Sequence, residues 1–155
     1  MPALIDSYTV TEQPKIPSTI IKLYQFDIDT STFSVIASPK REGINSRIHR
    51  LLKEYSTLKD NWDEADSLAP DSAALQWARY LTSMLERHGQ PIFHAAPGPN
   101  GEIMLDLRNH SANRTIEIIF YPNRSTIVFF PEDQPPSQEQ LNLDHLPKYL
   151  QWLNG

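Results

Sequence analysis

Residues 71–130 contain one change of hydrophobic period, and this change constrains the fold more than any other feature of the chain. From Ala74 to Leu85, apolar side chains recur every three or four positions, as they do along one face of an amphipathic helix. From Ile103 onward, apolar and polar side chains alternate, as they do along a strand with one buried face. The sequence therefore predicts a helix followed by strands.

Both ends of this helix are marked by residues that start or stop helices. Asp71 can accept hydrogen bonds from the first free backbone N–H groups, and therefore suits the N-cap position. Gly89 can adopt the left-handed conformation that ends many helices, and Pro91 cannot continue one. These signals predict a helix over residues 72–88.

The alternating region predicts three strands that short turns separate. The strands are expected over residues 103–108, 115–121 and 126–130. Connections this short require antiparallel neighbours, so we expect a meander with the helix packed across its inner face. The segment before the first strand, residues 97–101, is rich in turn residues, and its Asn-Gly pair favours a type I′ hairpin.

Further elements are predicted on both sides of this unit. Residues 45–58 carry an amphipathic helical pattern, and residues 19–28 and 32–37 are rich in strand-forming side chains. Pro131 to Pro136 predicts a rigid connector, after which Ser137 and Gln140 suit the start of a short turn. A short amphipathic helix is predicted from Asp144 onward, and its apolar side chains can dock on the same chain or on another one.

These patterns together predict an α+β fold. We expect an antiparallel sheet of about five strands, two main helices packed on one face of it, and a short C-terminal helix. Residues 19–153 are predicted to form a single domain, and residues 1–18 an extended N-terminal arm.

Composition excludes several classes of function. The chain has no cysteine, which excludes disulfides, thiolate nucleophiles and cysteine-ligated metals. Its net charge of −5 argues against a broad nucleic-acid-binding surface, since such surfaces need clustered Lys and Arg. No apolar run approaches the roughly 20 residues that span a bilayer. We expect no membrane association, no bound cofactor and a cytoplasmic location.

An acidic loop between the two predicted helices invites comparison with a calcium site. Asp60, Asp63, Glu64 and Asp66 surround Trp62. Calcium loops place oxygen ligands at alternate positions, and here Trp62 falls where such an oxygen is required. The sequence therefore predicts no metal site, and Trp62 is expected to close one end of the core.

Strand alternation brings three charged residues to the outer face of the predicted sheet. Asp106 and Arg108 lie on one strand and Glu117 on the next. As catalytic residues they would offer a carboxylate base beside an anion-binding arginine, with His94 or His110 nearby. As structural residues they would form cross-strand ion pairs on a solvated surface. The sequence leaves both interpretations open.

The same outer face also carries apolar side chains. Met104, Ile119 and Tyr121 share it, together with either Ile127 or Val128 according to the register. A half-apolar second face is usually covered, here by the N-terminal hairpin, the C-terminal helix or a second subunit.

Two hypotheses of function follow from this face. The first is a non-enzymatic protein-interaction or accessory module, with a protein partner or a second copy of the chain bound at Met104, Ile119 and Tyr121 or at Trp152 in the tail. The alternative is a small enzyme that uses Asp106, Arg108 and Glu117.

The order of several motifs also resembles a group of small bacterial proteins of unassigned activity. Those proteins share an NWD-G-x-G-A loop, a capped helix, a proline segment and a β-meander. The matching residues here are Asn61-Trp62-Asp63, Ala69-Pro70-Asp71, Ala74-Leu75, Ala78, Pro91, Pro97, Gly101 and the strand 103–108. This chain has Glu64, Ala65 and Asp66 where that motif has G-x-G. The resemblance implies the architecture over residues 61–130 and brings no catalytic residues.

Overall fold

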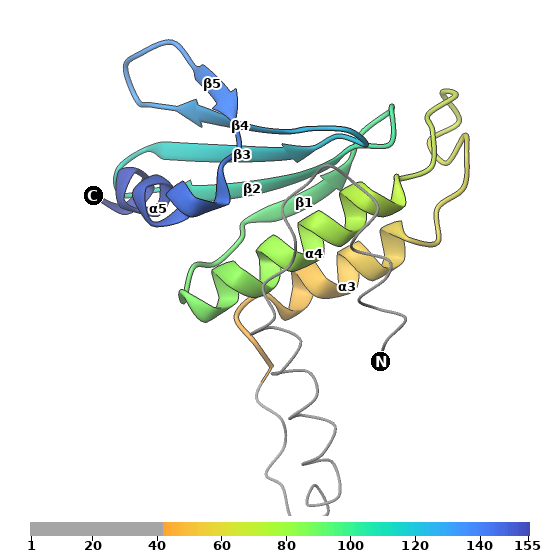
Figure 1. Cartoon of the computed structure of the whole chain (residues 1–155), viewed down its shortest axis with the longest axis horizontal. Helices are drawn as coiled ribbons and strands as arrows, with labels where there is room; N and C mark the ends of the chain where they lie inside the picture. The colour runs from red at the N-terminus through yellow and green to blue at the C-terminus, as the bar shows by residue number, and fades with distance from the viewer. Residues whose placement is uncertain (1–41) are drawn as a thin grey trace, which may run out of the picture. The chain divides into compact units, whose positions relative to one another are not determined.

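A five-stranded antiparallel sheet is the frame of this computed structural model, which describes residues 42–155 (Figure 1). Its strands follow one another in the order β1-β2-β3-β4-β5. The N-terminal arm and the two strands predicted before residue 42 lie outside the described residues. Residues 43–155 form one compact unit, and the α+β class is confirmed.

The three predicted strands are confirmed as the centre of the sheet. They are β2 (Ile103–Asn109), β3 (Arg114–Phe120) and β4 (Ser125–Phe130). The sheet has the expected number of strands, but its two edge strands were not predicted. They are β1 (His94–Pro97) and β5 (Ser137–Gln140).

The edge strands escaped prediction because their sequences do not alternate. All four side chains of β5 are exposed, so its strand conformation comes from pairing with β4 and not from an apolar pattern. The turn predicted at Ser137 is therefore wrong. In β1, Pro97 is the last strand residue and pairs with Ile103. The connection between them is closed by Gly98 N–H, which donates to the carbonyl of Glu102 at 2.9 Å.

The Asn-Gly pair in this connection does not form the favoured type I′ turn. Such a turn needs positive φ at both residues, whereas only Gly101 has it, at 86°. The longer loop instead pairs with the segment before the long helix. Pro99 carbonyl accepts from Leu68 N–H at 2.8 Å, and Gly101 carbonyl accepts from Asp71 N–H at 2.8 Å.

The inner face of the sheet is a continuous apolar surface. Register places Leu105 between Ala95 and Ile118, and Ile118 in turn lies opposite Ile127. All four side chains are buried at no more than 1% exposure. Since buried apolar area is the main source of stability in such a domain, this layer forms the core.

The long helix α4 (Ser72–Arg87) begins where the sequence predicts and ends one residue earlier. The Asp71 carboxylate accepts from Ala73 N–H at 2.9 Å and from Ala74 N–H at 3.1 Å, which confirms the predicted N-cap. Gly89 has φ of 67° just after the helix, as its predicted role requires. The buried face of α4 joins the same core as the inner sheet face.

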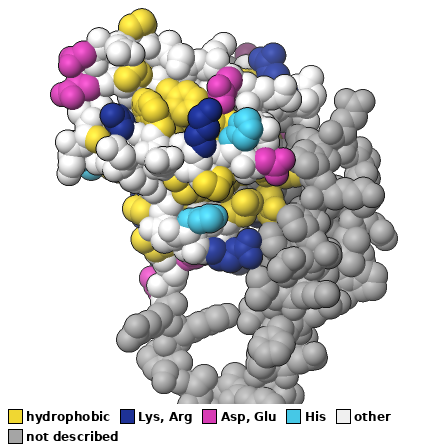
Figure 2. Space-filling model, turned by 60° about the vertical axis from the view of Figure 1, so that its left-hand side comes forward, with side chains coloured by type: hydrophobic (Ala, Val, Ile, Leu, Met, Phe, Trp, Pro, Cys, Tyr) yellow, Lys and Arg dark blue, Asp and Glu magenta, His cyan; other side chains and the backbone are white. Residues whose placement is uncertain are grey.

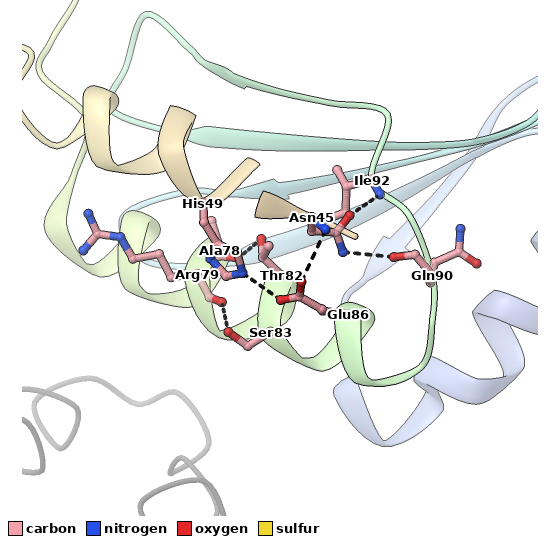
Figure 3. A network of polar contacts seen from close by, with 9 residues as sticks. All are labelled: Asn45, His49, Ala78, Arg79, Thr82, Ser83, Glu86, Gln90 and Ile92. Atoms are coloured by element: carbon pink, nitrogen blue, oxygen red, sulfur yellow. Dashed lines mark hydrogen bonds and ion pairs between the residues drawn. The ribbon is translucent and has the colours of Figure 1, made fainter. Parts of the chain in front are cut away.

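The first described helix, α3 (Ser46–Tyr55), is shorter than predicted and packs against α4. A polar network joins the start of α3 to the end of α4 (Figure 3). The buried Asn45 amide donates to Gln90 carbonyl at 3.0 Å and accepts from Ile92 N–H at 2.8 Å. Glu86 lies 3.1 Å from the His49 ring in the same network.

The C-terminal helix α5 (Leu146–Asn154) follows a short 3₁₀ turn, η2 (Leu143–His145), and confirms the predicted tail helix. Its buried side chains belong to the same core as those of α3 and α4. The Trp152 ring lies 5.0 Å from the Phe129 ring. Phe129 is two positions from Ile127 in β4 and therefore faces the same, inner side of the sheet. The tail therefore docks on the inner face, and the idea that it covers the outer face is wrong.

None of the helices between residues 42 and 155 is long and apolar enough to cross a bilayer.

Candidate functional site

The outer face of the sheet remains without a covering helix or strand among residues 42–155. Its side chains come from alternate positions of β2, β3 and β4. Register pairs Met104 with Ile119, and Glu117 with Val128. These four side chains are partly exposed, and the apolar three are absent from the contiguous core of the described residues.

The register also settles which β4 residue joins this face. Val128 lies opposite Glu117 on the outer side, whereas Ile127 is buried on the inner side. Phe130 is two positions from Val128 and therefore faces the same, outer side; it lies opposite Thr115 in β3. Phe130 was not singled out from the sequence, although the strand alternation could have found it.

Asp106 and Arg108 form a tight pair on this face. The Arg108 guanidinium donates from Nε to both carboxylate oxygens, at 3.2 and 3.0 Å, and from Nη2 to Oδ2 at 2.6 Å. Asp106 itself is only 5% exposed. The bond to Asp106 also raises the pKa of Arg108, so this arginine stays charged. The charges of the two residues are thus paired with each other, while the guanidinium keeps N–H donors that Asp106 does not use.

Phe93 completes the outer side of this pair, and sequence reasoning missed it. The Arg108 guanidinium carbon lies 3.8 Å from the centre of the Phe93 ring, a cation–π contact. Phe93 is 44% exposed, and its ring also contacts His110, with ring centres 5.9 Å apart. Phe93 lies just before the unpredicted strand β1, so no alternation pointed to it.

Glu117 lies directly opposite Asp106 in the β2–β3 ladder. Burial raises the pKa of the Glu117 carboxyl, the neighbouring Asp106 charge raises it further, and Arg108 partly offsets both. Among the described residues, the Glu117 carboxylate has no hydrogen bond and no ion pair within 4.0 Å. Glu117 is therefore a carboxylate at an apolar face without a direct cationic partner.

A cavity of about 350 Å³ lies beside Glu117 at the β2–β3 turn. The cavity walls combine polar and charged side chains with the phenyl ring of Phe130: Arg108, Asn109, His110, Asn113, Arg114, Thr115, Glu117 and Phe130. The structure thus brings two of the three predicted catalytic residues to one cavity. His110 lies there too, whereas His94 is an exposed residue opposite Asp106 in β1.

Two predicted binding residues lie away from this cavity. Trp152 is on the helix side, where Arg114 donates to the Trp152 carbonyl at 2.6 Å and its guanidinium lies 5.4 Å from the indole. Tyr121 follows the end of β3, and its ring lies 4.6 Å from the Arg124 guanidinium. The structure therefore unites Met104 and Ile119 but does not bring Trp152 to them.

Surface charge on one face of the described residues is mixed in sign. Figure 2 shows exposed hydrophobic side chains lying among basic, acidic and histidine side chains.

The acidic loop is held by its own hydrogen bonds. Ser67 donates from its hydroxyl to the Asp63 carboxylate at 2.5 Å and, together with backbone N–H groups, lowers the pKa of Asp63. Within residues 42–155, no three His, Asp or Glu side chains form a group that could hold a metal ion. Trp62 donates from its indole to Leu68 carbonyl at 3.0 Å. It is half-buried and lies outside the core, so the expectation that it closes the core is wrong.

This loop has an unusual backbone. Asn61, Glu64 and Asp66 all have positive φ, at 63°, 59° and 63°. Residues 64 and 66 are the positions at which the NWD-G-x-G-A motif has glycine, the residue that adopts positive φ without strain. The backbone thus has the geometry that such a motif would require, although this chain fills it with larger residues.

Comparisons with models of known families, with curated proteins and with solved structures give no match for this chain.

Proposed function

We propose that this chain is a non-enzymatic protein-interaction module that binds a partner protein on the outer face of its sheet. One observation carries the proposal: the described helices all pack on the inner face, which leaves Met104, Ile119 and Val128 in neighbouring rows of an uncovered face. Sheets with one half-apolar uncovered face usually bury it in an interface.

Catalysis at the same place is less well supported. Arg108 donates from its Nε and Nη2 to Asp106, so its positive charge is already paired with a carboxylate and attracts a substrate anion less strongly. Asp106 is likewise occupied and buried, so it offers no free base. Glu117 is the only one of the three candidates that retains an unengaged carboxylate.

The proposal is tested by affinity capture from a lysate of the cells that make the protein. The tagged full chain is compared with the Ile119→Lys and Gln151→Lys variants, and bound proteins are quantified by mass spectrometry. Both variants add one positive charge, but residue 151 is exposed on α5, on the other side of the sheet.

We expect Ile119→Lys to reduce a stoichiometric partner by about tenfold or more, because a charge would be buried in the interface. The Gln151→Lys variant should retain the partner. Residue 119 is partly exposed, so a lysine there can extend to water, and a thermal melt should show that the fold persists. A partner retained equally by both variants, or no partner in any sample together with a full chain that is monomeric in solution, would contradict the proposal.

The partner can also be a second copy of the chain. In that case the full chain should run as a dimer in light scattering, and Ile119→Lys should run as a monomer. A dimer that survives the substitution would place its interface elsewhere.

A further inference from the structure

The two edges of the sheet differ in how their backbone groups are satisfied. At the β1 edge, side chains of α3 occupy the outward carbonyl groups. The Tyr55 hydroxyl donates to the Ala95 carbonyl at 2.7 Å, and Arg47 donates to the Phe93 carbonyl. Pro97, the last residue of β1, has no N–H to offer. This edge is therefore closed to a further strand.

At the other edge, β5 presents backbone groups that no described residue binds. Leu141 N–H donates to the Ser125 carbonyl at 3.1 Å, so every second residue before Leu141 also bonds to β4. The N–H and C=O groups of Gln138 and Gln140 therefore point away from β4. Among the described residues β5 is the last strand of the sheet, as Figure 1 shows, and these groups have no backbone partner there. An extended segment can pair with such an edge through its own backbone.

The segment that contains β5 is acidic. Residues 125–147 carry no Lys or Arg, and four exposed acidic side chains lie within them: Glu132, Asp133, Glu139 and Asp144. None of the four has an ion pair within 4.0 Å among the described residues. Glu139 lies in β5 itself. A strand that carries Lys or Arg would therefore be attracted to this edge.

The same charges argue against a second copy of this chain at the β5 edge. Two antiparallel β5 strands engage all their outward groups when Gln138 of one copy faces Gln140 of the other. This register places the two Glu139 side chains directly opposite each other, and like charges in that position destabilise a sheet. The edge therefore suits a strand of opposite charge better than a copy of itself.

We propose that the β5 edge binds an extended, Lys- or Arg-bearing segment of a partner protein, which joins the sheet as a further strand. Backbone pairing at Gln138 and Gln140 would hold the segment, and the acidic side chains would select a basic sequence. This second contact surface is independent of the proposed function, because the edge can bind a strand whether or not the outer face is covered.

The test measures the binding of three synthetic peptides to the full chain by fluorescence anisotropy. The first peptide alternates Lys and Val, and the second alternates Glu and Val. The third is the Lys peptide with methyl groups on its backbone nitrogens. Methylation removes the backbone donors and keeps the charge, so the third peptide separates strand pairing from charge attraction alone.

A proline at residue 138 tests the edge from the side of the protein. The Gln138 N–H points outward, so Gln138→Pro removes a donor for a new strand but none for β4. The matched control is Gln134→Pro, the same substitution at an exposed residue in the β4–β5 connection. Both variants keep every acidic side chain.

We expect the Lys peptide to bind the full chain and Gln134→Pro equally, and to bind Gln138→Pro about tenfold more weakly. The Glu peptide and the methylated peptide should each bind the full chain about tenfold more weakly than the Lys peptide does. Amide exchange followed by NMR gives a readout that needs no variant. The Lys peptide should slow exchange of the Gln138 and Gln140 N–H groups and leave that of Gln134 unchanged.

Four results would overturn the inference. A Lys peptide that does not bind, or that binds equally with and without methylation, would show that no strand is added. A Glu peptide that binds as tightly would remove the selection for basic residues. Equal affinities of the two proline variants, with unchanged exchange at Gln138 and Gln140, would place binding elsewhere. A full chain that is a dimer in light scattering, and a monomer as Gln138→Pro, would assign the edge to a second copy.

Discussion

Asp106 and Glu117 face each other across the β2–β3 ladder, so two carboxylates occupy one register pair on the outer face of the sheet. Asp106 is 5% exposed and held by Arg108, whereas Glu117 is half-buried and has no bonded cation among the described residues. The fold tolerates this arrangement at a cost, since opposed like charges destabilise a sheet. The cost has measurable consequences for stability and for its pH dependence.

The first prediction concerns the pH dependence that Glu117 gives to stability. Its pKa in the folded protein is raised above its ordinary value of 4.5, so the folded state binds this proton more tightly than the unfolded state does. Glu117 therefore stabilises the folded state fully at pH values below 4.5, its ordinary pKa. This contribution is lost as the pH rises through the raised pKa of the folded protein. At neutral pH, Glu117→Gln should be more stable than the original chain by about 0.2–0.5 kcal/mol, a small gain because the group is largely solvent-screened.

Urea unfolding at neutral and at acidic pH measures this difference. The advantage of Glu117→Gln should disappear once the pH falls below 4.5, where the glutamic acid is itself neutral. Glu132→Gln, in an exposed connection, should show no such change with pH. An advantage that is constant across the titration would show that packing, and not charge, is responsible.

The second prediction concerns the pair that shields Asp106. In the Asp106→Asn variant, Arg108 loses its charged partner, and the unfolding free energy should fall by about 1–3 kcal/mol. The pKa of Glu117 should also fall, because the opposing charge is gone and Arg108 is released to approach Glu117. Carbon-13 NMR of the Glu117 carboxyl during a pH titration measures this change. An unaltered pKa would mean that burial alone raises it.

Local alternation was sufficient to find the centre of the sheet but not its edges. In β2 and β3 the buried apolar side chains occupy every second position, and in β4 Ile127 is the buried inner residue, so the apolar pattern of the sequence itself carries the period. The edge strand β5 (Ser137–Gln140) buries none of its side chains and depends on hydrogen bonding to β4. Because β5 is a strand only through its pairing with β4, its own sequence carries no apolar alternation that would predict it.

The candidate site could be predicted only in part for a related reason. Alternation alone placed Met104, Asp106, Glu117 and Ile119 on one face. It did not show that Asp106 lies opposite Glu117, since this depends on the register that the β2–β3 turn imposes. Nor could it predict the cavity, which the turn residues and Phe130 line together.

The third prediction concerns how α5 is held. Arg114 donates to the Trp152 carbonyl at 2.6 Å, and Asn109 donates to the Leu153 carbonyl at 3.0 Å. These carbonyls lie in the last turn of the helix, where the free acceptors and the dipole favour a cation. Arg114→Ala should therefore reduce amide-exchange protection in α5 by about 1 kcal/mol.

Hydrogen exchange followed by mass spectrometry resolves this effect for α5 separately from the rest of the chain. Arg124→Ala is the matched control, because Arg124 is exposed and its ring contact is with Tyr121 in the β3–β4 turn. Arg114→Lys should give an intermediate loss, since it retains the charge but not the planar donor group. Equal protection in the Arg114 and Arg124 alanine variants would contradict a capping role.

The last prediction concerns the acidic loop, where the backbone at Glu64 has φ of 59°. Side chains with a Cβ atom are strained in this region, and glycine is not. Glu64→Gly should therefore raise the unfolding free energy by about 0.5–1 kcal/mol, even though glycine gives the unfolded chain more freedom. The control is the neighbouring Ala65→Gly, at a residue that lacks positive φ, and it should lower stability. If both substitutions lower the midpoint of urea unfolding, the left-handed backbone at residue 64 is not a source of strain.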